Sequence, residues 1–484
     1  MKKLSKEEII SKRVDCRANI IATMGPACMQ KEQIAKIVES GAFIFRLNFS
    51  HGDYLEKQQM IDNVRAIEKS AGTILTIFQD LQGPKIRLGK IKDGYAKLKM
   101  GQNFILTTEK IEGDENIASI SHAQILKDIE AGKEIYINDG LVKLIATKIE
   151  GDKIHCKVVD DGEISTGRGV NFPGTSVRIP AITEKDKKDL AFALGAGIDM
   201  VALSFVRSAK DIEDLRGLMK KNGRIVPIIA KIEKWEAVEG IDEIIDASDV
   251  IMVARGDLGV ELPVEQVPVI QKRIIAACRK KGKPVITATQ MLISMVENPT
   301  PTRAEVSDIA NAVFDGTDTV MLSNETAVGK YGPRAVETMI KVIKNTEQNE
   351  RFMDLIEKYA VTPGSSSTES IADAACKIAQ NLNAKVIVCA TESGSSARLI
   401  SKHRPEAYVI AMTSQEDTLR KLSFSWGVMP VKVKPFTSSQ QTINKAVEVV
   451  KAMGVAKAGD TIVVTCGTIT QQAGTTNLIK VEKI

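Results

Sequence analysis

Short apolar runs rich in β-branched residues recur through the first two thirds of the chain, and each is followed by a stretch with helical spacing of its apolar positions. Strands buried on both faces of a parallel sheet give near-continuous apolar runs, and strands that alternate with helices indicate βαβ units. Eight such units predict a (β/α)8 TIM barrel, an α/β fold whose active site lies at the carboxyl ends of its strands. The runs cover residues 20–23, 43–47, 74–78, 200–205, 226–230, 250–254, 284–287 and 319–322.

One long insertion interrupts this pattern after the third run. Residues 84–180 contain short alternating runs separated by the turn sequences KDG, EGD, NDG and DDG, which are typical of an antiparallel β module. Pro84 and Pro180 at its edges indicate hinge points, and Thr183 with Asp186 approximates a capping box that begins the next helix. The remaining segments, 1–83 and 181–345, together make roughly 250 residues, which is the size of a typical barrel.

The last part of the chain, residues 346–484, predicts a separate small α/β domain. A loop rich in Pro, Gly and Ser at 362–368 precedes a helix that should begin near Ser370. Strand-like runs then alternate with helical patterns, at residues 385–390, 408–412, 428–433 and 461–465. The chain therefore has three parts: a split barrel, an insertion and a C-terminal domain.

Composition narrows the class of protein. Hydrophobic residues make up 43% and charged residues 26% of the chain, as in an ordinary globular protein, while aromatic residues are only 4%, so the cores must be mainly aliphatic. A formal charge of +5 is too small for this length to predict a nucleic-acid or membrane-surface protein. The chain has no run of 18 apolar residues and no signal peptide, and its dispersed cysteines indicate reduced thiols, so we predict a cytoplasmic location.

Polar residues follow nearly every predicted barrel strand, where the active site of such a barrel should lie. Glu233 and Asp257 follow neighbouring strands, and two carboxylates completed by substrate and water are what Mg2+ requires. Arg46, Arg87 and Lys231 can neutralise phosphoryl oxygens, and phosphoryl transfer depends on such positioning and charge. The backbone N–H groups of the segment 255–259 can hold a carboxylate if a helix begins there.

Any one of these charges, taken alone, is as well explained by a solvated loop or a salt bridge at the barrel rim. His51 alone is more often a hydrogen-bonded structural residue than a catalyst. A salt-bridge explanation becomes weak for the whole set, because polar clusters would then have to follow nearly every strand by chance. The spacing of the glycines around Gly195 and Gly329 does not fit a phosphate-binding P-loop.

Longer motifs give the chain a resemblance to the pyruvate kinase family over essentially its full length. The matching segments are RLNFSHG (46–52), QDLQGPKIR (79–87), NFPG (171–174), AKIE (230–233), VARGDLGVE (253–261), ATQML (288–292), PTRAE (301–305) and MLSNETAVGKYG (321–332). The resemblance implies a barrel domain (1–83 and 181–345), a small inserted β-barrel lid (84–180) and a C-terminal α/β allosteric domain (346–484). It also implies a homotetramer that transfers the phosphoryl group of phosphoenolpyruvate to ADP, giving pyruvate and ATP.

The resemblance further assigns roles to residues of the barrel mouth. Arg46 contacts the phosphoryl group, Lys231 stabilises its transition state, and Thr289 lies where the enolate is protonated. Glu233 and Asp257 hold the Mg2+, for which Mn2+ can substitute, and the backbone of Gly256 and Asp257 with the Thr289 hydroxyl holds the substrate carboxylate. Positions near the nucleotide match Asn48, His51, Arg87 and Arg168.

Lys85 marks a departure from many members of the family. Those members carry glutamate at this position and need K+, which is held by residues matching Asn48, Ser50, Asp80 and the backbone of Leu81. A lysine ammonium is a compact tethered cation, so Lys85 can supply the charge of the monovalent ion. The alternative is an exposed hinge lysine. The first interpretation predicts that K+ is not required.

The C-terminal domain contains a second candidate phosphate site, the loop from Thr391 to Ser396. It includes Ser393, Gly394 and Ser395, follows a predicted strand and opens a helix. It resembles the family's loop for a phosphorylated allosteric effector, although a helix cap built from serines explains it equally well. The nearby loop 466–472 lacks a basic residue, so a nucleoside or sugar monophosphate competes with fructose 1,6-bisphosphate as the effector.

Two other classes of function remain open at this point. A Mg2+-dependent carbon–carbon lyase on a similar barrel would share Glu233 and Asp257 and could use Lys231 as a Schiff-base lysine. A non-enzymatic metabolite- or RNA-binding role is the third possibility, but the few aromatic residues and the small net charge disfavour an RNA stacking surface.

Overall fold

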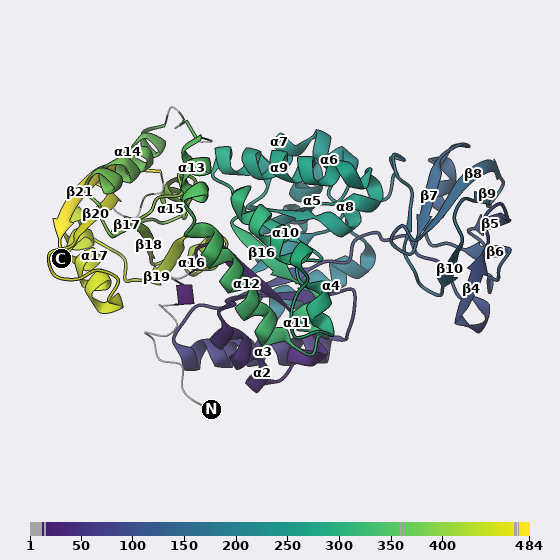
Figure 1. The fold of residues 1–484 in the computed structure, drawn as a ribbon, viewed down its shortest axis with the longest axis horizontal. Coiled ribbons are helices and arrows are strands. Elements are labelled where there is room, and N and C mark those ends of the chain that lie inside the picture. Colours follow the sequence, from purple (N-terminus) through teal and green to yellow (C-terminus); the bar gives the residue numbers. More distant parts are fainter. Residues whose placement is uncertain are drawn as a thin grey trace.

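The computed structural model describes residues 12–13, 16–358, 361–362, 364, 366–468, 472 and 474–484. Within these residues, eight parallel strands close into a barrel in the order β1-β16-β15-β14-β13-β12-β3-β2, at the centre of the molecule (Figure 1). The strands are β1 (Asn19–Met24), β2 (Ile44–Asn48), β3 (Thr76–Asp80), β12 (Met200–Leu203), β13 (Ile228–Ile232), β14 (Val250–Ala254), β15 (Val285–Ala288) and β16 (Thr319–Leu322). All eight predicted runs are therefore confirmed as barrel strands.

Strand β13, like β3, begins two residues later than the predicted apolar run. Pro227 lies before it and has no N–H to give to a β ladder, although its carbonyl accepts a hydrogen bond from Val201 N at 3.1 Å. This shift places Lys231 inside the strand rather than after it. Its side chain is therefore fixed by the sheet, which is a rigid support for a catalytic group.

Helices surround the barrel and bury the outer faces of its strands (Figure 1). The capping box predicted at Thr183 is confirmed, since Asp186 N donates to Thr183 Oγ1 at 3.1 Å and Thr183 N donates to Asp186 Oδ2 at 2.9 Å. The helices are α2 (Lys31–Ser40), α3 (Tyr54–Ala71), α4 (Glu184–Gly195), α5 (Ala209–Lys221), α6 (Trp235–Glu239), α7 (Ile241–Ala247), α8 (Arg255–Glu261), α9 (Val267–Lys281), α10 (Arg303–Phe314), α11 (Asn324–Ala327), α12 (Gly332–Glu347) and α13 (Glu350–Lys358).

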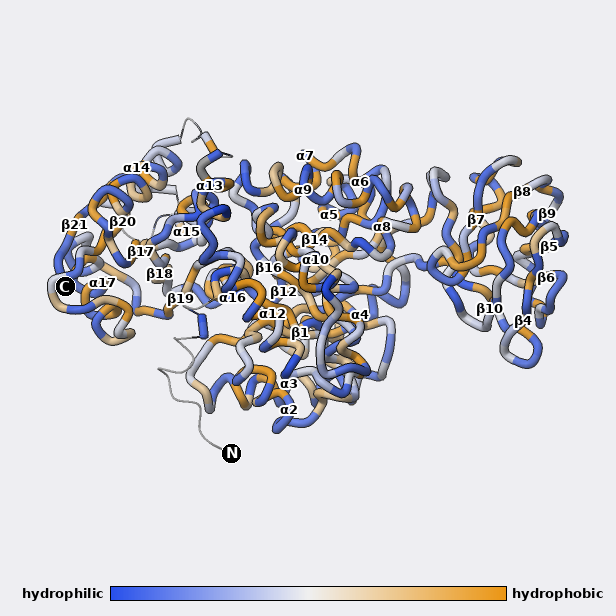
Figure 2. The backbone as a smooth tube through the Cα atoms, viewed as in Figure 1, coloured by the Kyte–Doolittle hydropathy of each residue, from blue (hydrophilic) through white to orange (hydrophobic). Residues whose placement is uncertain are grey.

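Two apolar layers explain why the barrel strands read as continuous hydrophobic runs. One layer fills the barrel interior and includes Ile21, Phe78, Met252 and Met321. The other lies between the strands and the surrounding helices and is almost entirely aliphatic. The strands accordingly run through the hydrophobic centre in Figure 2. No helix among the described residues is long and apolar enough to cross a membrane.

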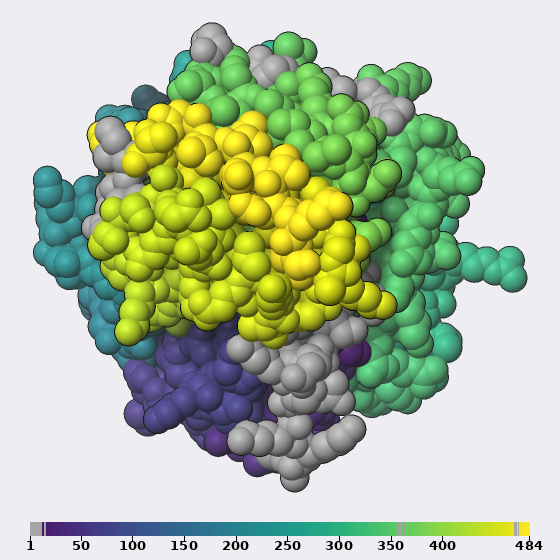
Figure 3. Space-filling model, turned by 90° about the vertical axis from the view of Figure 1, so that its left-hand side faces the viewer, coloured from purple at the N-terminus to yellow at the C-terminus, as the bar shows by residue number. Residues whose placement is uncertain are grey.

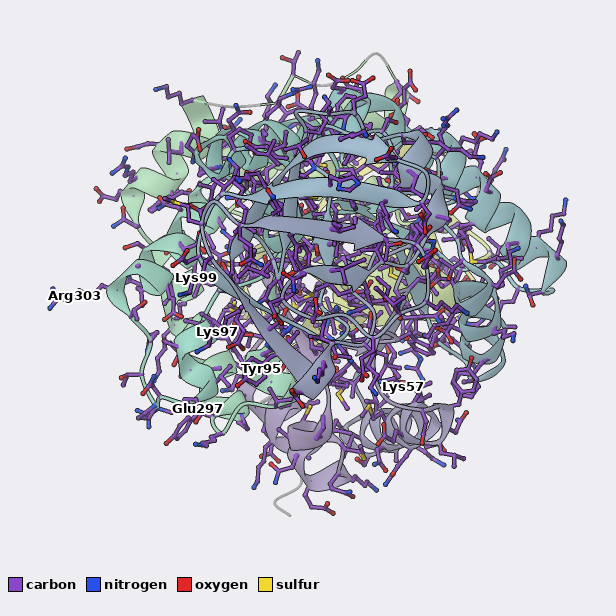
Figure 4. The ribbon with its side chains drawn as sticks, turned by 90° about the vertical axis from the view of Figure 1, so that its right-hand side faces the viewer. Lys57, Tyr95, Lys97, Lys99, Glu297 and Arg303 are labelled. Carbon is purple, nitrogen blue, oxygen red and sulfur yellow. The ribbon has the colours of Figure 1, made fainter. Side chains whose placement is uncertain are left out.

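The insertion, called the lid here, stands apart at one end of the molecule (Figure 1), and Figure 4 looks onto it along the long axis. Its sheets have the orders β11-β7-β8-β9-β5-β6 and β10-β4 and cover one aliphatic core. The prediction of a wholly antiparallel module is wrong at one place, because β5 and β6 pair in parallel. The strands are β4 (Tyr95–Leu98), β5 (Asn103–Thr107), β6 (Ile117–Ser119), β7 (Glu134–Ile137), β8 (Val142–Glu150), β9 (Lys153–Val158), β10 (Gly162–Ser165) and β11 (Val170–Asn171).

The parallel pair has a local cause. Asp114 Oδ1 accepts hydrogen bonds from Asn116 N at 2.7 Å and Ile117 N at 3.0 Å, and this turn reverses the chain ahead of β6. An extended connection between β5 and β6 then allows the second strand to run in the direction of the first. The turn tripeptides do not show whether the next strand pairs in parallel or antiparallel. The alternating pattern therefore predicted hairpins throughout.

The C-terminal domain has a five-stranded sheet in the order β19-β18-β17-β20-β21, and it covers the barrel when viewed from the opposite end (Figure 3). The four predicted strands are confirmed, and β21 (Thr476–Lys483) is an additional antiparallel edge strand whose largely polar sequence gave no apolar run. The other elements are β17 (Val386–Ala390), β18 (Tyr408–Thr413), β19 (Val428–Lys432), β20 (Thr461–Gly467), α14 (Ser367–Asn381), α15 (Ser395–Ser401), α16 (Glu416–Leu422) and α17 (Ser439–Met453).

The predicted helix near Ser370 begins at Ser367, because the Ser366 hydroxyl accepts a hydrogen bond from Glu369 N at 3.2 Å and caps it. Part of the loop predicted before it, residues 363 and 365, lies outside the described residues. The domain limits predicted from the sequence stay predictions.

Candidate active site at the barrel mouth

Arg46 and Asp80 form the first ion pair of the mouth, from the neighbouring strands β2 and β3. Arg46 Nε and Nη2 each lie 2.7 Å from Asp80 Oδ2, and Arg46 Nη1 donates to Thr23 Oγ1 at 3.3 Å. Burial alone would raise the pKa of Asp80, but the positive charges of Lys231 and Arg46 outweigh it and lower that pKa. Asp80 is therefore an ionised carboxylate that fixes the Arg46 guanidinium at the end of the strands.

Lys231 lies at the centre of the site, with its ammonium group among three oxygen atoms. Its Nζ atom is 2.7 Å from Ser204 Oγ, 3.2 Å from Asp80 Oδ1 and 2.8 Å from Glu233 Oε1. Burial lowers the pKa of Lys231, but the carboxylates of Asp80 and Glu233 more than compensate and raise it above its usual value. The lysine is therefore held as a cation, which suits phosphoryl charge and not Schiff-base formation.

Glu233 and Asp257 supply oxygen atoms suited to a divalent cation. Glu233 is fully buried, and its Oε2 atom accepts a hydrogen bond from Phe205 N at 2.8 Å. Its Oε1 atom is paired with Lys231 but has no hydrogen-bond partner of good geometry among the described residues. Burial raises the pKa of Glu233, and the negative charge of Asp257 raises it further. Two carboxylates that repel each other, with one oxygen unsatisfied, fit a hard cation such as Mg2+.

The described residues contain no group of three or more His, Cys, Asp or Glu side chains that could hold a metal ion by themselves. A two-carboxylate site of the kind expected from the sequence would need substrate and water to complete its coordination shell. Donors of this type favour Mg2+ or Mn2+ over softer metals.

The turn after β15 brings Thr289 against the first turn of α8. Gly256 N donates to Thr289 Oγ1 at 2.9 Å. Thr289 and the next residue, Gln290, have φ values of +72° and +55°, which are strained for residues with a side chain and are frequent at functional sites. Phe205, whose N–H holds Glu233, is a third such residue, with φ of +54°.

Arg255, the first residue after β14, does not contribute a free charge to the mouth. Its two terminal nitrogens pair with both oxygens of Asp308 at 2.6 and 2.7 Å, and it also donates to the carbonyls of Ala288 and Thr289. Arg255 therefore holds the strained Thr289 turn in place. Sequence position alone could not show this, because Asp308 belongs to a distant helix.

The residues after β2 lie beside a cluster of cations. Asn48 Oδ1 accepts a hydrogen bond from Ser50 N at 3.0 Å, and Asn48 is in register with Asp80. Partial burial lowers the pKa of His51, and the nearby charges of Arg87, Lys57, Arg46 and Lys185 lower it further. Positive charge therefore gathers near His51, which would suit an anionic ligand.

Two of these cations, Lys57 and Lys185, were missed by the sequence analysis. Lys57 is a buried residue of α3, and Lys185, in α4, donates to the carbonyl of Phe49 at 2.7 Å. Both occupy helical positions among many other lysines, so nothing in the sequence marks them. Only the packing of α3 and α4 beside β2 brings them to the mouth.

Lys85 lies at the junction of lid and barrel. Its Nζ atom is 3.5 Å from Asp257 Oδ1 and 3.8 Å from Asp139 Oδ1 of the lid. Asp80, one of the predicted ligands of the monovalent cation, is paired with Arg46 and Lys231, and the Leu81 carbonyl accepts from the Ser204 hydroxyl at 2.7 Å. Lys85 thus contacts the candidate Mg2+ ligand Asp257 and the lid.

The two predicted nucleotide-binding arginines lie on the lid side of the mouth. Arg87 Nη1 donates to the Gly167 carbonyl at 2.9 Å, and Arg168 Nε donates to Ser165 Oγ at 3.2 Å. Arg87 is close enough to the barrel for its charge to act on His51.

Comparison with known proteins agrees with this arrangement. A family model described as pyruvate kinase, barrel domain, matches residues 15–336, and one described as pyruvate kinase, alpha/beta domain, matches residues 369–482. The chain belongs to the pyruvate kinase family. It is therefore a phosphotransferase. Its match to the family covers both the barrel with its lid and the C-terminal domain.

Individual relatives are similar over almost the whole chain. The chain is 45% identical to pyruvate kinase 2 of Synechocystis sp. over 97% of its length and 79% of that protein. It is 41% identical to the pyruvate kinase of Sporosarcina psychrophila, over 97% of this chain and 80% of the relative. A crystal structure of a pyruvate kinase from Cryptosporidium parvum superposes with a TM-score of 0.92 at 36% identity and covers 99% of both chains.

The candidate effector loop of this pyruvate kinase family member lines a pocket in the C-terminal domain. Gly394 N donates to Thr391 Oγ1 at 3.0 Å, and the hydroxyls of Ser396 and Thr476 are 2.7 Å apart. Ser393 and Ser395 line the same pocket, together with Lys434, a cation that the sequence analysis missed. Residues 469–471 of the predicted selectivity loop lie outside the described residues.

Proposed function

We propose that this protein transfers the phosphoryl group of phosphoenolpyruvate to ADP, with Mg2+, giving pyruvate and ATP in the last step of glycolysis. The observation that carries the proposal is the Lys231 ammonium, held charged by Asp80, Glu233 and Ser204 beside the Arg46 guanidinium. Two fixed cations next to two carboxylates are what the transfer of a phosphoryl group between anionic substrates requires.

Different residues of the mouth would bind the metal ion, phosphoenolpyruvate and ADP. Glu233 and Asp257 would hold Mg2+, or Mn2+ in its place, which supplies charge to polarise the phosphoryl oxygens. The backbone of Gly256 and Asp257, with the Thr289 hydroxyl, would take the carboxylate of phosphoenolpyruvate. Arg87 and Arg168 on the lid side, with Asn48 and His51 on the barrel side, would hold ADP.

The reaction then follows from these positions. Arg46 and Lys231 neutralise the phosphoryl group as a terminal oxygen of ADP attacks phosphorus in line and the bond to the enol oxygen breaks. The enolpyruvate that remains takes a proton on carbon at the side of Thr289, directly or through water. Closure of the lid excludes water, which would otherwise compete as the acceptor of the phosphoryl group.

A lactate-dehydrogenase-coupled assay with phosphoenolpyruvate, ADP and Mg2+ tests the activity directly. In Lys231→Met, phosphoryl transfer should fall by about three orders of magnitude, because a fixed charge at the transition state is removed. Exchange of the methyl protons of pyruvate with solvent should remain detectable, since Thr289 and the carboxylate site are intact. Turnover like that of the wild type would refute the assignment.

A lyase with a Schiff-base lysine remains the second candidate, and the raised pKa of Lys231, caused by the carboxylates beside it, disfavours it. Treatment with borohydride in the presence of pyruvate should leave the protein without a covalent adduct. An adduct at Lys231 in the mass spectrum would favour the lyase.

We also propose that K+ is not required, because Lys85 places a tethered ammonium between Asp257 and the lid. Adding K+ to a Na+- and K+-free assay should change the wild-type rate by less than about twofold, whereas Lys85→Met should become dependent on a monovalent cation. A strict K+ requirement of the wild type would contradict this proposal.

The pocket at Thr391–Ser396 supports a regulatory role in which a phosphorylated metabolite activates the enzyme. Lys434 is a cation able to pair with one phosphate there. A panel of sugar and nucleoside monophosphates, with fructose 1,6-bisphosphate, tested in the same assay would identify the effector. A homotetrameric assembly in the cytoplasm, with no nucleic-acid or membrane partner, completes the proposal, and sedimentation would test the assembly.

A further inference from the structure

The lid is joined to the barrel by two chain segments that run side by side. Leu88 N donates to the Arg168 carbonyl at 2.8 Å, and Val170 N donates to the Ile86 carbonyl at 2.9 Å. We call residues 84–88 and 168–172 the hinge. Its strand β11 is also tied into the lid sheet, because Asn171 pairs with Tyr136 of β7. Movement of the lid must therefore move Asn171.

The side chain of Asn171, in the hinge, contacts Glu261, the last residue of α8. Asn171 Nδ2 donates to Glu261 Oε1 at 3.3 Å, and Lys234 Nζ lies 2.6 Å from the same oxygen. The Glu261 side chain is 1% exposed. Among the described residues, its second oxygen, Oε2, has no hydrogen-bond partner. A buried, incompletely satisfied carboxylate attracts any donor strongly, so the Asn171 amide is worth more here than at a solvated surface.

The two ends of α8 meet the lid and the reaction centre at once. Asp257, in its first turn, is paired with Lys85 of the hinge, while Glu261, at its other end, is bonded to Asn171 of the hinge. At 1.5 Å per residue the helix is only about 10 Å long, so it transmits a shift at one end to the other as a rigid unit. The hinge thus contacts the helix that carries the proposed Mg2+ and carboxylate sites at both ends.

A cavity lies beside these contacts, between the hinge and the barrel. Lys85, Ile86, Asn171, Phe172, Phe205 and Lys234 contribute to its walls. Because space remains there, close packing alone does not fix the position of the hinge. Polar contacts such as that between Asn171 and Glu261 must supply the preference for one lid position.

We propose that Glu261 is a positioning residue, which latches the hinge, and with it the lid, to α8 through Asn171. The proposal rests on the proposed function, in which Arg87 and Arg168 bring the lid side to the nucleotide. The contact between Asn171 and Glu261 is formed in this structure, in which the lid stands apart from the barrel (Figure 1), so it fixes the hinge on which the lid moves. Without it, Glu261 would keep Lys234 alone. The latch therefore favours the arrangement in which lid and barrel hold ADP together.

Steady-state kinetics of Asn171→Ala, Glu261→Gln and the double variant test the latch. Each single change should raise the KM for ADP, lower kcat, or both, so that kcat/KM for ADP falls about tenfold, the value of one hydrogen bond to a charged group. The KM for phosphoenolpyruvate should change less than that for ADP, because α8 carries its proposed carboxylate site but stays packed in the barrel. The double variant should be no worse than the worse single, since the two residues act through one contact.

A reversed pair separates the latch from a general loss of structure. Asn171→Asp alone places two carboxylates face to face and should be the most impaired variant. Combined with Glu261→Gln, it restores a donor and an acceptor across the seam and should recover most of the lost kcat/KM. Asn103→Ala, at an exposed lid asparagine whose side chain accepts from Lys157, is the matched control and should behave as the wild type.

Hydrogen–deuterium exchange of the hinge peptides gives a readout that does not depend on catalysis. Exchange in residues 84–88 and 168–172 should be about tenfold faster in Glu261→Gln than in the wild type and unchanged in Asn103→Ala. Unchanged exchange, additive kinetic losses or failure of the reversed pair would each overturn the latch. An inactive wild type would overturn the proposed function instead, and the exchange rates would still decide the latch.

Discussion

The floor of the barrel, where its strands begin, is closed by the C-terminal domain, whereas the mouth, where the same strands end, holds charges. At the floor, Phe424 enters the barrel core and packs edge-on against Phe78 with ring centroids 6.1 Å apart. The side chains of Asn19, Thr76 and Thr319, each the first residue of its strand, donate to backbone carbonyls of residues 420–425. These hydrogen bonds and ring contacts satisfy the strand starts, although Ser425 Oγ has no hydrogen-bond partner among the described residues.

At the mouth, by contrast, a buried carboxylate is incompletely satisfied and the backbone is strained. Glu233 is fully buried with an oxygen that lacks a hydrogen bond among the described residues, and Phe205, Thr289 and Gln290 have strained backbones. These features cost stability, and they occur where substrates and a cation are expected to bind. The comparison teaches that one sheet serves stability at one end and chemistry at the other.

The largest effect on kcat should come from removing a charged side chain at the mouth. Glu233→Gln removes one of the two proposed Mg2+ ligands, so kcat should fall by about a thousandfold, or about 4 kcal/mol in activation free energy. Thermal stability should change little or rise, because burial raises the pKa of Glu233 and so shows that its charge is costly in the folded state. Coupled assays across a Mg2+ titration and differential scanning calorimetry would measure both effects.

Glu236→Gln is the matched control for that experiment. Glu236 is a nearby glutamate of α6 whose pKa burial also raises, but it has no assigned contact with the phosphoryl group. It should retain activity within about threefold of the wild type. Equal losses of activity in the two variants would contradict a specific role of Glu233 at the mouth.

A change in the packing at the floor should lower stability and leave activity nearly unchanged. Phe424→Ala leaves a cavity at the floor of the barrel core and should lower the free energy of unfolding by about 3–5 kcal/mol. At a temperature where the protein is folded, kcat should change by less than about threefold. Urea denaturation and the coupled assay would show this. A variant that loses activity without losing stability would mean that the floor takes part in catalysis.

A smaller, pH-dependent effect on the free energy of unfolding is expected from His403, which follows α15 in the C-terminal domain. Its side chain is 10% exposed, and burial lowers its pKa from 6.5 to about 4. The unfolded chain binds a proton near pH 6.5 and the folded protein resists it down to about pH 4. The stability that this histidine contributes is therefore complete above pH 6.5 and is lost as the pH falls toward 4, by about 3 kcal/mol in all.

His403→Gln should flatten this part of the curve of unfolding free energy against pH. Denaturation at several pH values between 7.5 and 4.5 would measure it, with His155→Gln at the lid surface as the control. An unchanged acid slope in His403→Gln would show that the histidine is not buried as a neutral group.

The sequence was a good guide wherever one local signal sufficed. The eight apolar runs, the Thr183 cap and four of the strands of the C-terminal domain were predictable because burial on both faces and capping leave a local pattern. The edge strand β21 was not, since half of its residues are exposed and its sequence mixes polar with apolar positions. The parallel pairing of β5 with β6 was not either, because both directions of pairing give the same alternation.

For the candidate site, the sequence determined which groups stand at the strand ends, because the end of each strand is a local property. The residue types at Arg46, Asp80, Lys231, Glu233 and Asp257 already specified cations beside oxygen donors. Only the tertiary structure decided their partners: it bound Arg255 to Asp308, brought Lys57 and Lys185 to His51, and joined Asn171 of the lid to Glu261. Those pairs depend on how helices and lid pack across the barrel, and packing between distant segments leaves no mark in local sequence spacing.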